Sequence, residues 1–134
     1  MKKIVLISCV SQTRTYRSKA KDLYISALFK KNLAYARRLN PDAIYVLSAK
    51  YGVLDLETEI DPYNLTLNTM SAGEIKIWAD RVLQQLKQVA NLPDDHFIFL
   101  AGMKYRKYLL PHLRSFEIPL EGLTIGKQLQ ALSR

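Results

Sequence analysis

The sequence has little of what disulfide-bonded, membrane-spanning or fibrous proteins need. It has 134 residues with one cysteine, five glycines and five prolines, so it can form no internal disulfide and is neither collagen-like nor disordered in composition. Its longest apolar runs, at residues 4–7 and 97–101, are far shorter than the ~20 residues that cross a bilayer. Only four apolar residues separate the basic N-terminus from Ser8, so no signal peptide is predicted. We expect a cytoplasmic protein without a membrane segment.

Cofactor signals are missing as well. The two histidines, His96 and His112, and the cysteine are dispersed, and they give no spacing typical of a metal site. No glycine pattern matches a Walker A sequence or a dinucleotide-binding loop. We therefore predict no metal site and no cofactor.

Positive charge is abundant but unevenly placed. Residues 1–40 hold ten basic side chains and one acid, Asp22, whereas the rest of the chain holds ten basic and eleven acidic side chains. Such a local excess attracts phosphates, and nucleic acid is the usual polyanion. The alternative is a solvated charged face without a partner. The predicted phosphate contacts are Arg14, Arg17, Lys19 and Lys21 in a loop, and Lys30, Lys31, Arg37 and Arg38 on a helix.

Hydrophobic periodicity predicts a single α/β domain over residues 1–134. The apolar runs at 3–7, 43–47 and 97–101 are typical of buried parallel strands. Spacing of three or four residues predicts helices over 25–39 and 75–86, and Ser71 with Glu74 forms a capping box before the second helix. The remaining expectations are helices at 103–110 and 125–132, an edge strand at 116–119, and irregular connections at 10–21 and 53–68. Strands that alternate with helices imply a three-layer α/β/α sandwich around a mostly parallel sheet.

Polar side chains gather where the predicted strands end. In open α/β sheets, ligands bind beyond the carboxyl ends of the strands, and this rule brings residues 8–26, 48–64 and 102–105 to one edge. Aromatic rings stack on bases and cations bind phosphates, so these segments suit a planar, phosphate-bearing ligand. Their polar members are Asp22, Tyr24, Ser26, Ser48, Lys50, Tyr51, Asp61, Tyr63, Asn64 and Tyr105.

Three residues in these segments have alternative interpretations. Asp22, the sole acid in the basic stretch, is either a general base or a structural residue such as a salt-bridge partner or helix N-cap. Asn64 could position water through its amide but cannot take up a proton, so it is the second candidate. Cys9 could be nucleophilic, but no histidine is paired with it, which favours a buried structural cysteine.

Several short blocks follow one another in a fixed order along the chain. They are Ser8-Cys9, DLYIS at 22–26, SAKYG at 48–52, Pro62-Tyr63, Gly102 with Tyr105, and GKQL at 126–129. The series resembles a small prokaryotic and phage domain family of uncharacterised function. YGVL at 51–54, Pro62-Tyr63 and AGMKY at 101–105 are also similar to a series in the YaaA peroxide-stress proteins. That small family in turn resembles the uracil-DNA-glycosylase-like domain, which is also found in archaeosine synthase.

The resemblance implies a DNA glycosylase-like enzyme that flips a damaged or hypermodified base out of DNA and cleaves its N-glycosidic bond, in DNA repair or anti-phage defence. It needs no cofactor, and no obligate protein partner is indicated. Two other interpretations stay open: a non-catalytic DNA-binding protein in stress protection, and an N-glycosidase or transferase that acts on free nucleotides. The implied catalytic residues are Asp22 and Asn64, the backbone contacts are Arg14, Arg17, Lys19 and Lys21, and the substrate-binding residues are Cys9, Tyr24, Ser26, Ser48, Lys50, Tyr51, Tyr63, Tyr105 and Gln128.

Overall fold

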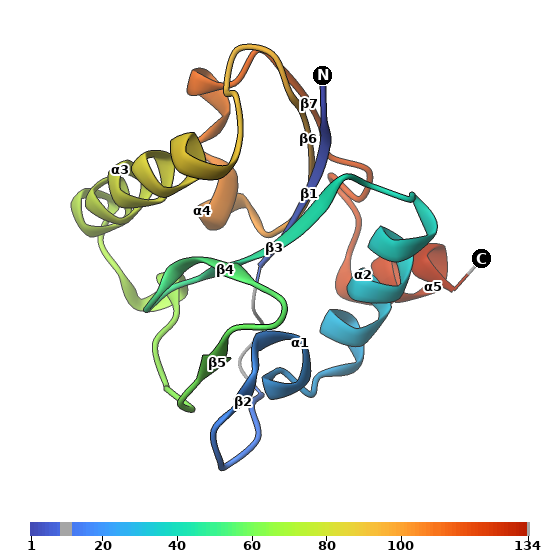
Figure 1. The fold of residues 1–134 in the computed structure, drawn as a ribbon. Coiled ribbons are helices and arrows are strands. Elements are labelled where there is room, and N and C mark those ends of the chain that lie inside the picture. Colours follow the sequence, from blue (N-terminus) through green and yellow to red (C-terminus); the bar gives the residue numbers. More distant parts are fainter. Residues whose placement is uncertain (9–11, 134) are drawn as a thin grey trace.

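The structure is a computed structural model that describes residues 1–8 and 12–133 (Figure 1). Predicted substrate-binding residue Cys9 lies outside the described residues. Strands and helices alternate along most of the chain, as the periodicity predicts. In chain order the elements are β1 (Lys3–Ser8), β2 (Ser18–Lys19), α1 (Ala20–Leu23), α2 (Ala27–Arg38), β3 (Ala43–Ser48), β4 (Gly52–Asp55), β5 (Glu59–Ile60), the 3-10 helix Leu67–Thr69, α3 (Ala72–Val89), β6 (His96–Leu100), α4 (Met103–Arg106), the 3-10 helix Leu110–His112, β7 (Ser115–Glu117) and α5 (Ile125–Leu132).

Five of the strands form one sheet in the order β4-β3-β1-β6-β7. Strand β1 lies at the centre, and its pairs with β3 and β6 are both parallel. Strand β7 extends the parallel part, whereas β4 returns antiparallel to β3. The three predicted core strands and the predicted edge strand near Phe116 are therefore confirmed.

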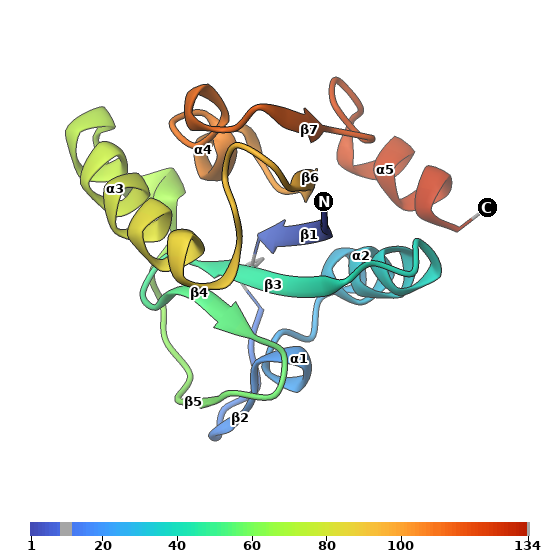
Figure 2. The same cartoon turned by 45° about the horizontal axis from the view of Figure 1, so that its top comes forward.

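Helices cover both faces of this sheet because successive residues of a strand point to opposite sides. Ile4 and Leu6 of β1 pack in one core with α3, while Val5 and Ile7 pack in a second core with α1 and α2. Figure 2 shows α3 and α4 on one side of the sheet, with α2 and α5 on the other. The predicted layering of helices on both faces of a mostly parallel sheet is confirmed.

The two long helices begin at the caps that the sequence contains. Ser71 and Glu74 exchange both hydrogen bonds of a capping box at the start of α3, as predicted. Helix α2 begins after Ser26, whose side chain accepts a hydrogen bond from the Phe29 N–H. The structural alternative for Asp22, an N-cap of this helix, is therefore wrong. The predicted helix at 103–110 is also shorter in the structure, since α4 ends at Arg106 and a 3-10 turn follows.

The two connections that we expected to be irregular contain short paired strands. Strand β4 forms a tight hairpin with β3, and β2 pairs antiparallel with β5. Gly52 makes the hairpin possible, because its φ of 77° is strained for other residues. A Cβ at this glycine would also lie 2.1 Å from Gln85 Oε1, which accepts a hydrogen bond from the Val53 N–H. Strands of two to four residues are too short for the period of two to be recognised in the sequence.

None of the helices in the described part of the chain is both long and apolar enough to cross a membrane.

Candidate functional site

The parallel register brings the ends of three strands to one edge of the sheet. Ser8 is aligned with Leu47, one residue before the end of β3, and Ile7 is aligned with Leu100, the last residue of β6. The Ser8 hydroxyl accepts a hydrogen bond from the Gly102 N–H at 3.3 Å, which ties β1 to the start of α4. The expected edge is therefore formed. Most of the predicted residues lie at or near it in three places: a cavity at the ends of β1 and β6, a cluster at the end of β3, and a cleft beside α2.

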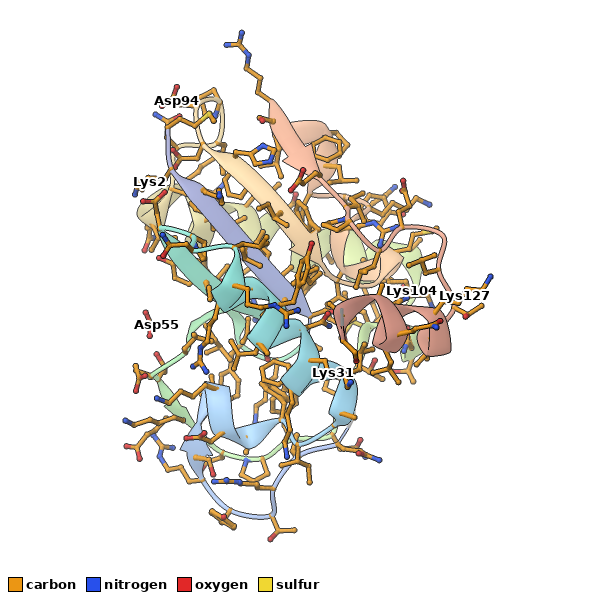
Figure 3. The ribbon with its side chains drawn as sticks, turned by 90° about the vertical axis from the view of Figure 1, so that its right-hand side faces the viewer. Lys2, Lys31, Asp55, Asp94, Lys104 and Lys127 are labelled. Carbon is orange, nitrogen blue, oxygen red and sulfur yellow. The ribbon has the colours of Figure 1, made fainter. Side chains whose placement is uncertain are left out.

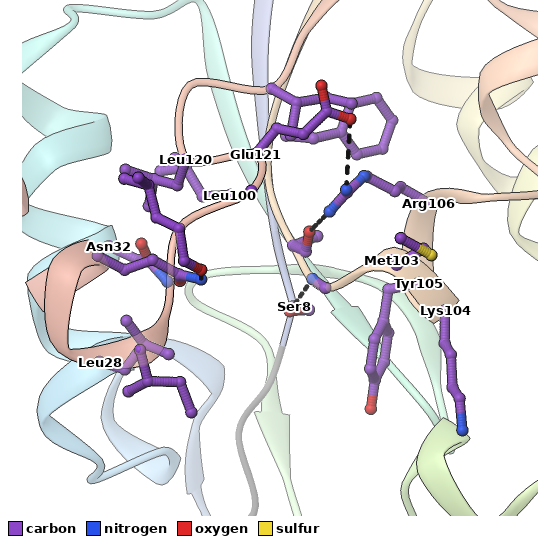
Figure 4. Close-up of a pocket in the computed structure, with 18 of the residues that line it drawn as sticks. Ser8, Leu28, Asn32, Leu100, Met103, Lys104, Tyr105, Arg106, Leu120 and Glu121 are labelled. Atoms are coloured by element: carbon purple, nitrogen blue, oxygen red, sulfur yellow. Dashed lines mark hydrogen bonds and ion pairs between the residues drawn. The ribbon is translucent and has the colours of Figure 1, made fainter.

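A cavity of about 510 Å³ opens at the end of β1 and β6. This volume lies within the roughly 300–1,000 Å³ typical of small-molecule sites. Its walls come from α2, the turn from β6 into α4, the segment 118–123 and the start of α5 (Figure 4). Leu28, Leu100 and Leu120 provide apolar surface, and the polar groups include the side chains of Asn32, Arg106 and Gln128. We call this the strand-edge cavity.

Asn32 is the most unusual residue of the strand-edge cavity. It lies in the middle of α2 with 4% of its surface exposed, and its Oδ1 has no hydrogen-bond partner among residues 1–8 and 12–133. An unsatisfied buried polar group costs about 1–3 kcal/mol, and asparagine is also a poor residue for the interior of a helix. A ligand that donates a hydrogen bond to this oxygen would remove the cost.

Gln128 contributes a second amide from α5. Its Nε2 donates to the carbonyl of Leu123 at 2.9 Å, which fixes the position of the amide. The helix that carries it begins at Thr124, whose side chain caps the Lys127 N–H. Two residues with side-chain amides, from two helices, therefore line one cavity.

Arg106 is the buried cation of the strand-edge cavity. Its residue is only 9% exposed, and its Nη1 donates to the carbonyl of Ala101 at 2.7 Å. Its Nη2 lies 3.6 Å from an oxygen of Glu121, the one carboxylate that the described residues place on the cavity wall. The backbone contact holds the guanidinium in place from one side, and Glu121 balances its charge from the other.

A second group of predicted residues meets at the end of β3. The Ser48 hydroxyl donates to Tyr63 Oη at 2.7 Å, and Tyr63 Oη lies 2.6 Å from Tyr24 Oη. Ser48 Oγ also accepts hydrogen bonds from the N–H groups of Lys50 and Tyr51. The ring of Tyr51 packs edge-on against Tyr63, and Lys50 Nζ lies 5.3 Å from the centre of the Tyr51 ring. The fold thus assembles five of the predicted binding residues, with Ser48 and Tyr24 fully buried.

The other predicted binding residues are dispersed. Tyr105 packs edge-on against Trp78 in the core beneath α3, and its hydroxyl lies 3.4 Å from the Leu67 N–H, although the residue also borders the strand-edge cavity. Ser26 is the N-cap of α2. Asn64, the second predicted catalytic residue, is exposed and lines neither the strand-edge cavity nor the cleft that contains Asp22.

Asp22 lies in a cleft of its own. The cleft has a volume of about 380 Å³ and lies beside the opposite face of α2 from Asn32. Among the residues that the structure describes, none lines both this cleft and the strand-edge cavity. Its charged lining residues are Asp22, Arg14, Lys21, Lys30 and Arg37, and we call it the cationic cleft.

Most of the predicted phosphate contacts of the loop form ion pairs within the fold, including Lys21, which also lines the cationic cleft. Lys19 and Lys21 both contact Glu57, at 2.9 and 2.7 Å, and Arg17 lies 3.3 Å from Asp61. The hydrogen bond from Lys21, followed by that from Lys19, lowers the pKa of Glu57 to about 2. The same carboxylate raises the pKa of Lys19 through a hydrogen bond. Three of the four predicted loop cations therefore have acidic partners from the segment around β5.

Two cations of α2 form hydrogen bonds with the end of the C-terminal helix α5. Lys31, on the side of α2 that faces α5 (Figure 3), donates a hydrogen bond to the hydroxyl of Ser133. Arg38 Nη2 donates to the carbonyl of Leu132 at 2.8 Å. Both contacts satisfy groups at the end of α5, where cations are favoured. Of the helical phosphate contacts predicted, Lys30 and Arg37 line the cationic cleft.

Sequence reasoning missed three residues of the strand-edge cavity: Asn32, Arg106 and Glu121. Asn32 could have been found, because it occupies a position on the apolar stripe of α2 between Leu28 and Ala36. Arg106 and Glu121 had no comparable signal, since their pairing depends on a turn that follows β7. Among residues 1–8 and 12–133, no three His, Cys, Asp or Glu side chains come together as a group that could hold a metal ion.

Comparison with known proteins identifies a family but gives no activity for it. No curated protein and no solved structure matches the chain. A family model matches residues 4–134 and therefore covers nearly the whole length, including every wall of the strand-edge cavity. The chain belongs to DUF6884, a family of unknown function.

Proposed function

We propose that the protein is a DNA glycosylase-like enzyme that holds a nucleobase in the strand-edge cavity and cleaves its N-glycosidic bond. The observation that carries the proposal is the side-chain amide of Asn32, whose buried Oδ1 has no partner in the described part of the chain. The residue borders a largely apolar cavity together with Gln128, and the amide reaches a ligand there by turning toward the cavity. The edge of a nucleobase carries N–H donors, and side-chain amides pair with such edges. Leu28, Leu100 and Leu120 supply apolar surface for the faces of the ring.

The blocks that resemble other families also support this proposal. Ser8, Gly102 and Gln128 come from three of those blocks, and all three line the strand-edge cavity. Relationship to the YaaA proteins and to uracil-DNA-glycosylase-like domains is part of the proposal, and it rests on those blocks together with the α/β fold.

The proposed reaction is hydrolysis at the anomeric carbon of the sugar. Water adds to C1′ as the C1′–N bond breaks, and the base leaves with the bonding electrons and is protonated. A carboxylate takes the proton from the water. Glu121 is the carboxylate that the described residues place on the wall of this cavity, so it is the candidate for this role when the base binds there. The sequence predicts Asp22 for the same role, but Asp22 lines the cationic cleft on the other side of α2, so it can act only on a base that binds in that cleft.

The test is release of free base from DNA. Duplex and single-stranded oligonucleotides that contain ordinary or modified bases are incubated with the protein, and free base and alkali-labile sites are measured. We expect base release from at least one modified substrate, reduced by roughly 10²-fold or more in Asp22→Asn or Glu121→Gln. Asp80→Asn, on the exposed face of α3, is the matched control and should retain activity. Tight DNA binding without base release from any substrate would contradict the enzymatic proposal and support DNA binding alone.

The ion pairs of the basic segment favour a second candidate, an enzyme that acts on free nucleotides. Ion pairs engage Arg17, Lys19 and Lys21, and hydrogen bonds to the end of α5 engage Lys31 and Arg38. At least half of the ten basic side chains of residues 1–40 therefore already have partners within the fold. Salt dependence separates the two candidates, since log affinity falls by about 0.9 per bound phosphate for each unit of log salt. A slope near one favours the free nucleotide, and a slope of several units favours DNA.

A further inference from the structure

The ion pair between Arg106 and Glu121 is asymmetric. The Arg106 side chain is 10% exposed and the Glu121 side chain is 66% exposed. Their separation of 3.6 Å is longer than the roughly 2.7–3.2 Å of an N–H···O hydrogen bond. Glu121 therefore balances the charge of the guanidinium without satisfying its donors. A buried arginine whose forked donors are used at only one end can accept a better anion.

The side chain of Glu121 can move away from Arg106 without unfolding its turn. The turn is held locally, by hydrogen bonds from the Glu121 N–H to the Ile118 carbonyl and from the Leu123 N–H to the Leu120 carbonyl. Gly122, the next residue, has a φ of 80°, and a Cβ built on it would meet nothing within 4 Å. Because the carboxylate is largely in solvent, the Glu121 side chain can turn away from Arg106 while Ile118 and Leu120 stay packed against the two cores.

Figure 4 places Arg106 and Asn32 on different walls of the strand-edge cavity, on α4 and α2 respectively. Resting on the proposed function, we propose that the cavity takes a whole nucleotide, with its base at Asn32 and its phosphate at Arg106. Glu121 is then the internal counter-ion that the phosphate displaces. A guanidinium binds phosphate through two parallel hydrogen bonds, which its present contact with Glu121 does not provide.

The two members of this one ion pair should have opposite effects on binding. The affinities of the four ribonucleoside 5′-monophosphates and of the matching nucleosides are measured by calorimetry. We expect the best monophosphate to bind at least ~10-fold more tightly than its nucleoside, and Arg106→Gln to abolish this difference. Glu121→Gln should instead tighten monophosphate binding by roughly 3-fold or more without changing nucleoside binding. Glu117→Gln, a similarly exposed carboxylate on β7, is the matched control and should change neither.

The proposal is overturned either by the wild-type protein or by the Glu121→Gln variant. In the wild-type protein, the contradicting result is equal binding of nucleosides and monophosphates, or no binding of either. In Glu121→Gln, it is weaker monophosphate binding, as expected if the pair only stabilises the fold. If Arg106→Gln does not fold, Arg106→Lys and the exposed Glu121→Gln still decide between these results.

Failure of this inference is distinguishable from failure of the proposed function. Phosphate-dependent binding without base release would contradict the glycosidase proposal and support the nucleotide site. Base release without phosphate-dependent binding would support the glycosidase proposal and contradict the nucleotide site. A short single-stranded oligonucleotide tested beside the monophosphates identifies the source of the phosphate. Competition by the oligonucleotide at Arg106 indicates a nucleotide within DNA, and competition only by monophosphates indicates a free nucleotide.

Discussion

The two clefts on either side of α2 differ in what holds their polar groups. The cationic cleft is lined by one carboxylate, that of Asp22, and by Arg14, Lys21, Lys30 and Arg37, and this excess of charge is already visible in the sequence. In the strand-edge cavity, Asn32 is buried with no partner for its Oδ1 among the described residues, and Arg106 is buried beside Glu121. Net charge therefore indicates where an anion can approach, whereas an unsatisfied buried group indicates where a ligand can be recognised.

The basic segment shows why charge along the sequence overestimates charge on the surface. Residues 1–40 carry ten basic side chains and one acidic side chain, which gives a net charge of +9. Folding brings Glu57 against Lys19 and Lys21, and Asp61 against Arg17. These two acids offset only part of the charge of the segment, and they come from the connection after β4, which is distant in sequence.

The largest effect should follow from removing the Asn32 amide, which borders the strand-edge cavity. We expect Asn32→Leu to lower base release and nucleotide binding by roughly 10²-fold or more, because the apolar side chain cannot accept a hydrogen bond. The same substitution should raise the free energy of unfolding by about 1–3 kcal/mol, since it removes an unsatisfied buried group. Activity assays and urea unfolding measure the two effects, with Gln84→Leu on the exposed face of α3 as control. Full activity in Asn32→Leu would show that the cavity is not the site.

The cationic cleft is tested next through its carboxylate. If Asp22 activates water, Asp22→Asn should fold normally and bind DNA normally, with base release lower by roughly 10²-fold. The cationic cleft would have no catalytic role if Asp22→Asn kept full activity while Asn64→Ala abolished it. In that case an exposed amide would position the water.

A smaller effect is expected from charge removal, and it should differ between paired and cleft cations. Replacing Arg14, Lys30 and Arg37 with glutamine should flatten the salt slope of DNA binding by about one unit for each phosphate that is no longer bound. The same change at Arg17, Lys19 and Lys21 should flatten it less, because those cations already have acidic partners. Equal slopes for the two triple variants would show that the ion pairs open on binding.

The smallest effect concerns the pH dependence of the paired segment. Because the pKa of Glu57 is lowered from 4.5 to about 2 in the folded protein, its stabilising contribution is present above pH 4.5 and is lost as the pH falls toward 2. Wild-type protein and Glu57→Gln should therefore differ in urea midpoint at about pH 5 and converge near pH 2. The difference should be small and should shrink in high salt, since the side chain is 57% exposed. A difference that persists near pH 2 would contradict this origin.

Much of the scaffold could be predicted because its signals are local. The apolar runs of β1, β3 and β6 and the capping box at Ser71 are contiguous in sequence, and the structure confirms them. Strands β2, β4 and β5 could not be predicted, since two to four residues give no periodicity and the β3–β4 hairpin depends on a turn at Gly52. The edge at which polar groups gather followed from the parallel order of strands.

The site was less predictable because it depends on how helices face one another. Ser48, Tyr24 and Tyr63 do meet, although 39 residues separate the two tyrosines. Asn32 was hidden in the stripe of an otherwise ordinary amphipathic helix. Arg106 and Glu121 pair only because the segment after β7 returns across the end of β6, which no local pattern indicates.

The side-chain amides of asparagine and glutamine report most directly on whether the strand-edge cavity is the ligand site. In ¹⁵N-labelled protein, the Asn32 and Gln128 amide resonances are assigned by Asn32→Asp and Gln128→Glu and followed during titration with the tightest-binding nucleoside monophosphate. The account predicts saturable shifts at both amides and only small shifts at the backbone amides of Lys30 and Arg37. Saturable shifts confined to Lys30 and Arg37, with both side-chain amides unmoved, would contradict it.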